Sequence, residues 1–177
     1  MANNPEEFNR AKIIVEPLFM QILNNGIKYK ISEKDNTIKN YIKYEFISIE
    51  SASTERDRKC HIDIDTFDNL YEHILFDVKS ITPSNFRDNN NHNYSITIDC
   101  WDFLNKRYIE NNLQYKFHYL AFQMIENKQY LNKFIVVNSY YLITKNIVFL
   151  SKTGDNYLVS YKELCNLDNC YIYESDI

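Results

Sequence analysis

The chain has 177 residues, of which 45% are hydrophobic, so it is long enough and apolar enough to bury one compact core. We therefore expect a single domain over residues 1–177. Glycine (2) and proline (3) are scarce, which argues against collagen-like, linker-rich and turn-rich β proteins. The net charge of −4 is opposite in sign to that of a domain that binds nucleic acid through bulk positive charge. Binding of DNA would therefore have to be confined to a cleft, where a bound metal supplies the positive charge.

Four cysteines are present, and no two of them have CxxC spacing. The N-terminal residues are polar and acidic, unlike a secretory or mitochondrial leader. No apolar run approaches the ~20 residues that a membrane-spanning helix needs. We therefore expect a soluble, cytoplasmic protein with reduced thiols and no membrane partner. The Ile-, Lys-, Asn- and Tyr-rich composition fits an AT-rich genome, including that of a phage or a large DNA virus, in which case the location is the host cell.

The first half of the chain predicts one helix and four strands. Residues 5–25 have helical spacing of apolar side chains, and Asn24-Asn25-Gly26 is a helix stop. Pro17 either kinks this helix or begins a second one. The polar segment from Ser51 to Lys59 (SASTERDRK) predicts a mobile loop. Strands are predicted at 27–31, 41–49, 61–67 and 71–80, and the last two form a hairpin around Asp68-Asn69.

The second half predicts short elements of both kinds. Residues 83–93 are a polar loop, and residues 102–116 are either a short helix or a long hairpin connection. Strands are predicted at 94–101, 119–125, 134–137, 147–150 and 157–160, with helices at 139–144 and 161–167. The chain as a whole predicts a mixed α/β fold with a central sheet.

Asp63, Asp77 and Lys79 form the pattern with chemical meaning. Asp77 and Lys79 are two residues apart on one strand, so their side chains project from the same face. A hairpin that turns near Leu70 places Asp63 opposite Asp77, because both are equidistant from residue 70. Two adjacent carboxylates repel each other unless a hard divalent cation such as Mg²⁺ or Mn²⁺ lies between them. A lysine beside that cation can orient the attacking water or neutralise charge that develops on phosphorus.

These motifs resemble the PD-(D/E)XK nuclease superfamily, which includes restriction enzymes, Holliday junction resolvases and many phage nucleases. The segment Ile62-Asp63-Ile64 is similar to its apolar-Asp-apolar element, and Phe76-Asp77-Val78-Lys79-Ser80 is similar to a common form of its second motif. The resemblance also includes Ile96-Thr97-Ile98-Asp99, the strand from Phe117 to Phe122, and Phe134 to Val137, so that it extends over roughly residues 11–145.

The resemblance implies a restriction-endonuclease-like α/β (α+β) core, in which a central mixed sheet is flanked by helices. It implies an enzyme that hydrolyses phosphodiester bonds in DNA with Mg²⁺ or Mn²⁺, and it allows a homodimer. Asp63, Asp77 and Lys79 would be catalytic, with the two aspartates as metal ligands. Glu16 would be the additional acid from the first helix, although Pro17 disfavours helical geometry there. Ile62 replaces the proline of the family motif, and Asp65 on the same face is an alternative ligand.

Other residues allow more than one interpretation. Arg56, Arg58 and Lys59 precede the Asp63 strand and would either contact phosphates or lie in a solvated loop. Cys60-His61 suggests zinc, but no second Cys/His pair supports it. The chain could also be an inactive nuclease-like protein that binds nucleic acid or a protein partner. On an unrelated α/β fold, Asp77 and Lys79 would form only a surface ion pair.

Overall fold

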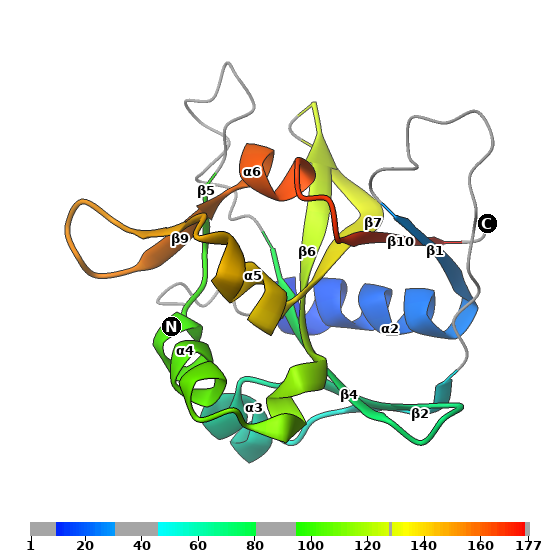
Figure 1. Cartoon of the computed structure of the whole chain (residues 1–177). Coiled ribbons are helices and arrows are strands. Elements are labelled where there is room, and N and C mark those ends of the chain that lie inside the picture. The colour runs from blue at the N-terminus through cyan, green and yellow to red at the C-terminus, as the bar shows by residue number, and fades with distance from the viewer. Residues whose placement is uncertain (1–9, 31–45, 81–94, 128, 176–177) are drawn as a thin grey trace.

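The computed structural model describes residues 10–30, 46–80, 95–127 and 129–175 (Figure 1). These residues form a mixed α/β structure in which a curled mixed sheet is flanked by helices. The predicted loop at 83–93 lies outside the described residues, and so does the first part of the predicted strand at 41–49.

Of the two alternatives for Pro17, the structure has the second, in which a new helix begins beside it. A π-helical turn, η1 (Ala11–Val15), leads directly into α2 (Glu16–Asn25). Proline has no N–H and its ring clashes with the preceding turn, so a widened turn before it relieves the clash. Val15 and Phe19 are buried on one face, and the helix ends at the predicted stop before Gly26.

Within the described residues, the central sheet has seven strands in the order β1-β10-β7-β6-β4-β3-β2. Its strands are β1 (Gly26–Lys30), β2 (Phe46–Ser51), β3 (Ile64–Asp68), β4 (His73–Lys79), β6 (His118–Glu126), β7 (Gln129–Asn138) and β10 (Tyr171–Ser175). The pairing of β4 with β6 is parallel, and the other pairings in this sheet are antiparallel. Strand β10 was not predicted from the sequence, and it joins β1 to the rest of the sheet.

The predicted hairpin forms between β3 and β4 with the predicted register. Ile64 pairs with Phe76 and Phe67 pairs with His73, so paired residues are equidistant from residue 70. Asp68 fixes the turn, because its Oδ1 accepts hydrogen bonds from the backbone N–H groups of Leu70 and Glu72, each at 2.9 Å. The register prediction is therefore confirmed.

The prediction of a loop from Ser51 to Lys59 is wrong, because most of this segment belongs to the helix α3 (Thr54–Cys60). Ser53 is its N-cap, and the Ser53 hydroxyl accepts a hydrogen bond from Arg56 N at 3.1 Å. Glu55 and Lys59 form an ion pair one turn apart, at 2.8 Å. The apolar periodicity that usually reveals a helix is missing, since α3 has no buried residues, and capping and charge pairing stabilise it instead.

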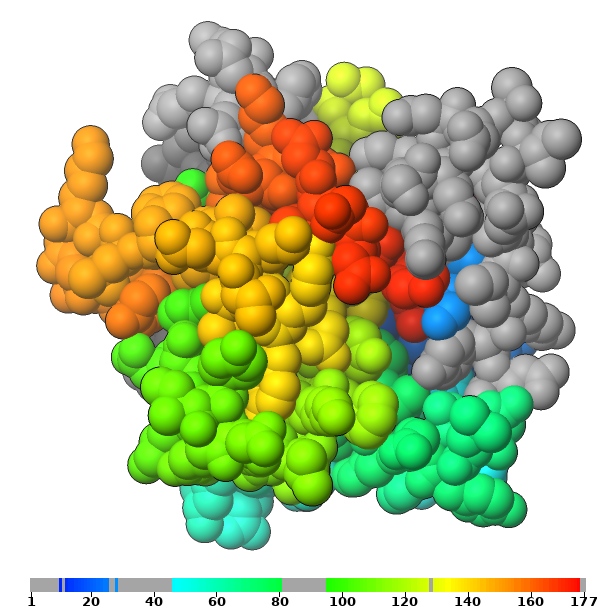
Figure 2. Space-filling view, in the orientation of Figure 1, coloured from blue at the N-terminus to red at the C-terminus, as the bar shows by residue number. Residues whose placement is uncertain are grey.

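A second sheet of three strands lies beside the first in the described part of the chain, in the order β5-β9-β8. It consists of β5 (Ser95–Thr97), β8 (Val148–Leu150) and β9 (Tyr157–Ser160). Figure 2 shows the β8–β9 hairpin projecting from the body of the molecule. The strand predicted at 94–101 is thus shorter than expected, because the chain turns after Thr97 into α4.

The remaining helices are short. They are α4 (Trp101–Ile109), the 3₁₀ helix η4 (Leu113–Phe117), α5 (Ser139–Lys145) and α6 (Tyr161–Cys165). The helical alternative for residues 102–116 is therefore correct, and the helices predicted at 139–144 and 161–167 are confirmed.

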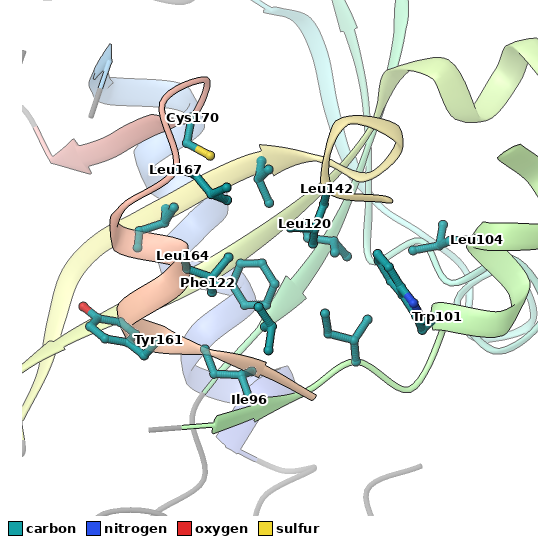
Figure 3. Packing of buried hydrophobic residues seen from close by; sticks show 14 of the residues in the cluster. Ile96, Trp101, Leu104, Leu120, Phe122, Leu142, Tyr161, Leu164, Leu167 and Cys170 are labelled. Atoms are coloured by element: carbon teal, nitrogen blue, oxygen red, sulfur yellow. The ribbon is translucent and has the colours of Figure 1, made fainter. Parts of the chain in front are cut away.

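The central sheet separates two apolar clusters. On one face, α2 contacts β1 and β10 at one end of the sheet and β2 at the other, so the sheet curls around this helix. Phe19 packs edge-to-face on Phe76 and Phe134 at centroid distances of 5.2 and 4.8 Å. On the other face, side chains from α4, α5 and α6 converge on Leu120 and Phe122 of β6 (Figure 3).

The two faces of β4 therefore differ in chemistry. Phe76 and Val78 point into the α2 cluster. Because side chains alternate along a strand, Asp77 and Lys79 point to the opposite face.

None of the helices in the described residues is both long and apolar enough to cross a membrane.

Candidate metal centre

Asp63 and Asp77 come together where the β3–β4 hairpin opens. Asp63 immediately precedes β3, whose pairing with β4 ends at Ile64–Phe76, and a hydrogen bond joins the side chains of Asp63 and Asp77. The N–H of Asp63 donates to the Phe76 carbonyl at 2.8 Å. Its carboxylate Oδ2 in turn accepts a hydrogen bond from the N–H of Val78 at 2.7 Å. The Asp63 side chain is thus held against the backbone of β4, beside Asp77.

Both carboxyl groups are buried: Asp63 is 7% exposed and Asp77 is 5% exposed. Burial is the main cause that raises the pKa of Asp63 well above its ordinary value. The negative charges of Asp77, Glu16 and Asp57 raise this pKa further, as does a hydrogen bond with Asp77. Ionising Asp63 is therefore costly until a cation offsets the crowded negative charge.

Glu16 joins this group from the first residue of α2 and is also 7% exposed. Burial raises the pKa of Glu16, and the charges of Asp57 and Asp77 raise it further, while a hydrogen bond from Lys12 lowers it. Pro17 does not remove Glu16 from the group, because the π-turn before it carries the chain into the helix. The structure thus brings together Glu16, Asp63 and Asp77, which the sequence placed on three separate elements.

Lys12 lies among the carboxylates and was not predicted. Its Nζ is 2.9 Å from Glu16 Oε2 and 3.4 Å from Asp63 Oδ1, and it also contacts Asp57. Burial lowers the pKa of Lys12, but hydrogen bonds to Asp57 and Glu16 outweigh burial, and the net change is upward. One ammonium group therefore neutralises part of a cluster whose acids come from four segments of the chain. We call Glu16, Asp57, Asp63 and Asp77 the acidic cluster.

Lys79 lies on the other side of Asp77. Its Nζ is 3.1 Å from Asp77 Oδ2 and 2.5 Å from Asp99 Oδ1. Burial alone would lower the pKa of Lys79, but the charges of Asp77 and Asp99 raise it well above its ordinary value. Conversely, burial would raise the pKa of Asp99, but Lys79 lowers it to about 2. Lys79 is thus a fixed cation beside Asp77.

Asp65 does not join the acidic cluster. Its two carboxylate oxygens accept from Arg56 Nε and Nη2, each at 2.8 Å, and Oδ1 is 2.7 Å from His73 Nε2. Burial would raise the pKa of Asp65, but the hydrogen bonds from Arg56 and His73 lower it overall. Arg56 and His73 therefore already satisfy this carboxylate, which favours Asp63 over Asp65 as a ligand.

The basic residues predicted to contact phosphates lie on or beside α3. Arg56 is engaged with Asp65, and Lys59 is engaged with Glu55. Arg58 is exposed. Two of the three are therefore committed to ion pairs within the chain, and a phosphate could recruit them only by competing with a carboxylate.

Several residues around the centre could not be recognised as such from the sequence. His118 is fully buried, where burial lowers its pKa and favours the neutral ring. Its Nε2 donates to the His61 carbonyl at 2.9 Å, and its Nδ1 is 2.5 Å from Ser139 Oγ. Cys100 donates its thiol hydrogen to Asp77 Oδ2 at 3.3 Å. Two local patterns in the sequence could have pointed to further residues of this centre. They are the i,i+4 spacing of Lys12 and Glu16 and the strand-like alternation that ends at Asp99.

No known protein family, curated protein or solved structure matches this chain. The geometry of the residues themselves is therefore what supports a functional proposal.

Proposed function

We propose that this chain is a Mg²⁺- or Mn²⁺-dependent nuclease that hydrolyses phosphodiester bonds in DNA. The observation that carries the proposal is the pair of buried carboxyl groups, Asp63 and Asp77, which are hydrogen-bonded to each other beside the ammonium of Lys79. If Asp77 and Lys79 formed only a solvated ion pair on an unrelated fold, we would expect neither the burial of Asp63 and Asp77 nor their contact across the hairpin.

The donor atoms of the acidic cluster suit a hard divalent cation. All are carboxylate oxygens, which Mg²⁺ and Mn²⁺ prefer. The pKa values of Asp63 and Glu16 are raised mainly by burial and further by neighbouring carboxylates, and a cation bound there would favour the ionised forms. Asp63 and Asp77 would be ligands, and Glu16 could complete the set. When bound, the cation polarises the scissile phosphate and lowers the pKa of the attacking water.

The chain's own groups position the reactants. The Val78 N–H fixes the orientation of the Asp63 carboxylate at 2.7 Å. Lys79, held between Asp77 and Asp99, would orient the attacking water or stabilise charge on the phosphorus oxygens. Because Lys79 is already fixed in place, little reorganisation is needed when the substrate binds.

The order of the elements supports the finer proposal of a restriction-endonuclease-like core. Helix α2 precedes the meander of β2, β3 and β4, and the helix α4 and strand β6 follow it. Asp63 immediately precedes β3, and Asp77 and Lys79 lie on the neighbouring strand β4 of this meander. The β3–β4 hairpin therefore brings Asp63 and Asp77 together, as the resemblance implies.

Lys12 favours a second candidate function, a nuclease-like protein that binds nucleic acid or a protein partner without cleaving. Its ammonium already lies within contact distance of Glu16, Asp57 and Asp63. A permanent internal cation at this position would make a metal unnecessary. This alternative predicts no Mn²⁺ binding at the acidic cluster.

The test of the leading proposal is a cleavage assay with the purified chain, Mg²⁺ and linear, single-stranded and branched DNA. Lys79→Ala is expected to reduce cleavage by at least about 100-fold, because removal of one such electrostatic group typically costs this much. Lys133→Ala is the matched control, since this partly exposed lysine pairs with Glu174 on another part of the sheet. Equal cleavage by wild type and Lys79→Ala would overturn the proposed site.

A further inference from the structure

Three side chains with different donor atoms gather next to the acidic cluster: Asp99 contacts Lys79, Cys100 contacts Asp77, and His61 lies close to both. One ligand atom from each of His61, Asp99 and Cys100 lies within 4.8 Å of the other two. His61 follows α3, whereas Asp99 and Cys100 immediately precede α4. The sequence suggested zinc at Cys60-His61 but offered no second pair of ligands, and the fold now supplies Asp99 and Cys100.

The backbone holds these residues in place. His61 ends α3 in the left-handed conformation (φ 55°, ψ 48°), and its N–H donates to the Asp57 carbonyl at 3.0 Å. Its carbonyl accepts from the buried His118 at 2.9 Å. A non-glycine residue at positive φ is retained when its surroundings fix it. The His61 ring is therefore presented from a constrained position.

We propose that His61, Asp99 and Cys100 form a binding site for one thiophilic divalent cation of the Zn²⁺ class. Nitrogen, oxygen and sulfur donors together suit Zn²⁺ and not Mg²⁺. With Zn–N near 2.0 Å, Zn–S near 2.3 Å and tetrahedral angles, donor atoms lie about 3.3–3.7 Å apart. The present separations of up to 4.8 Å can close by side-chain adjustments of about an ångström. Three protein ligands leave the fourth position to water.

Binding at this site would alter the neighbouring contacts. The Cys100 thiol is protonated and buried, and it donates to Asp77. Coordination replaces the S–H bond with a bond to the cation, and the proton passes to solvent. Asp99 would be drawn from Lys79, which it now contacts at 2.5 Å. The cation would also be repelled by the Lys79 ammonium. Its affinity therefore depends on whether the attraction of three ligands outweighs this repulsion.

The proposal does not depend on nuclease activity, and its test uses binding alone. The full chain is titrated with Co²⁺, and the absorption from thiolate-to-Co²⁺ charge transfer is recorded. We expect one Co²⁺ per chain with this absorption, its displacement by one equivalent of Zn²⁺, and no displacement by a large excess of Mg²⁺. Failure to see thiolate absorption in the wild-type chain would overturn the proposal.

Variants then identify the ligands. Cys100→Ser is expected to abolish the charge-transfer band and weaken Zn²⁺ binding at least about tenfold. Asp99→Asn, at a more exposed position, is expected to weaken binding while the band remains. Cys60→Ser and Cys165→Ser are matched controls that keep the His61, Asp99 and Cys100 set, and both should bind like wild type. A band that persists in Cys100→Ser, or that disappears in Cys60→Ser, would contradict the assignment.

Discussion

Asp63 accepts a backbone hydrogen bond and at the same time lies in a crowded acidic environment. The Val78 N–H stabilises its carboxylate, but burial and the charges of Asp77 and Glu16 raise its pKa. A side chain placed at such a cost in free energy is characteristic of a functional site. The cost should be measurable as lost stability in the absence of metal.

We predict that Asp63→Asn is more stable than wild type at neutral pH in the presence of a chelator. Asparagine keeps an oxygen that can accept from Val78, but it removes one negative charge from the cluster. A gain of ~1 kcal/mol would raise the melting temperature by about 2–4 °C in a chain of this size. Thermal unfolding followed by circular dichroism measures the shift.

Asp65→Asn is the contrasting variant, because Asp65 is paired with Arg56 and His73. Its melting temperature should fall or stay unchanged. A melting temperature of Asp63→Asn at or below that of Asp65→Asn would refute the idea that crowded carboxylates destabilise the chain at Asp63.

Lys12 gives a second prediction at this scale. Replacing it by methionine removes the ammonium that contacts Glu16, Asp57 and Asp63. Without metal, Lys12→Met should melt at a lower temperature, because three carboxylates lose their counter-charge. With Mn²⁺, its melting temperature should rise at lower metal concentrations than that of wild type, because metal no longer competes with the ammonium.

Lys59→Met serves as the control for this experiment, since the exposed Lys59 pairs with Glu55 one turn away on α3. Its Mn²⁺ dependence should match that of wild type. An unchanged Mn²⁺ dependence in Lys12→Met would show that the ammonium does not occupy a metal position.

At the scale of elements, the β3–β4 hairpin determines whether the site exists. A shift of one residue in its register would turn either Asp63 or Asp77 to the other face of the sheet. Asp68 fixes this register through two hydrogen bonds to the turn backbone and is 8% exposed.

We predict that Asp68→Ala lowers the free energy of unfolding by about 1–3 kcal/mol, because two backbone N–H groups lose a buried acceptor. Urea denaturation measures the change. Asp68→Asn keeps an acceptor oxygen and should recover much of the loss. Equal stability of Asp68→Ala and wild type would mean that strand packing alone sets the turn.

The sequence predicted this hairpin because both of its signals are local. Alternation identified the two strands, and Asp68-Asn69 marked the turn between them. Helix α3 was missed for the opposite reason, since it has no buried face and depends on the Ser53 cap and charge pairs. With α3 assigned to a loop, Asp57 could not be placed near Glu16. Strand β10 was missed because its final residues are polar and pair only with distant strands.

At the scale of the whole molecule, the sequence predicted a mixed α/β fold with a central sheet and a hairpin of the strands at 147–150 and 157–160, but not the curvature of the central sheet or the pairing of β5 with that hairpin. Both arise from contacts between distant segments, such as α2 with β2 and β10, and β5 with β9. The same limit explains the site. Asp63, Asp77 and Lys79 are joined by one hairpin and were predicted together, whereas Lys12 and Asp99 reach them only through tertiary packing.

Chain-wide charge also has a consequence at this scale. The chain carries a net charge of −4, and the acidic cluster adds local repulsion to it. A divalent cation that binds the folded chain but not the unfolded chain should therefore raise the free energy of unfolding. The gain is about 2.7 kcal/mol at a cation concentration 100 times the dissociation constant.

The proposed metal centre is tested most directly by the position of Mn²⁺ in a crystal of the wild-type chain, located by its anomalous scattering. We expect one ion that is bound by carboxylate oxygens of both Asp63 and Asp77, at about 2.2 Å from each. Full Mn²⁺ occupancy elsewhere with the Asp63–Asp77 position empty, or side chains of Asp63 and Asp77 on opposite faces of the sheet, would contradict this expectation.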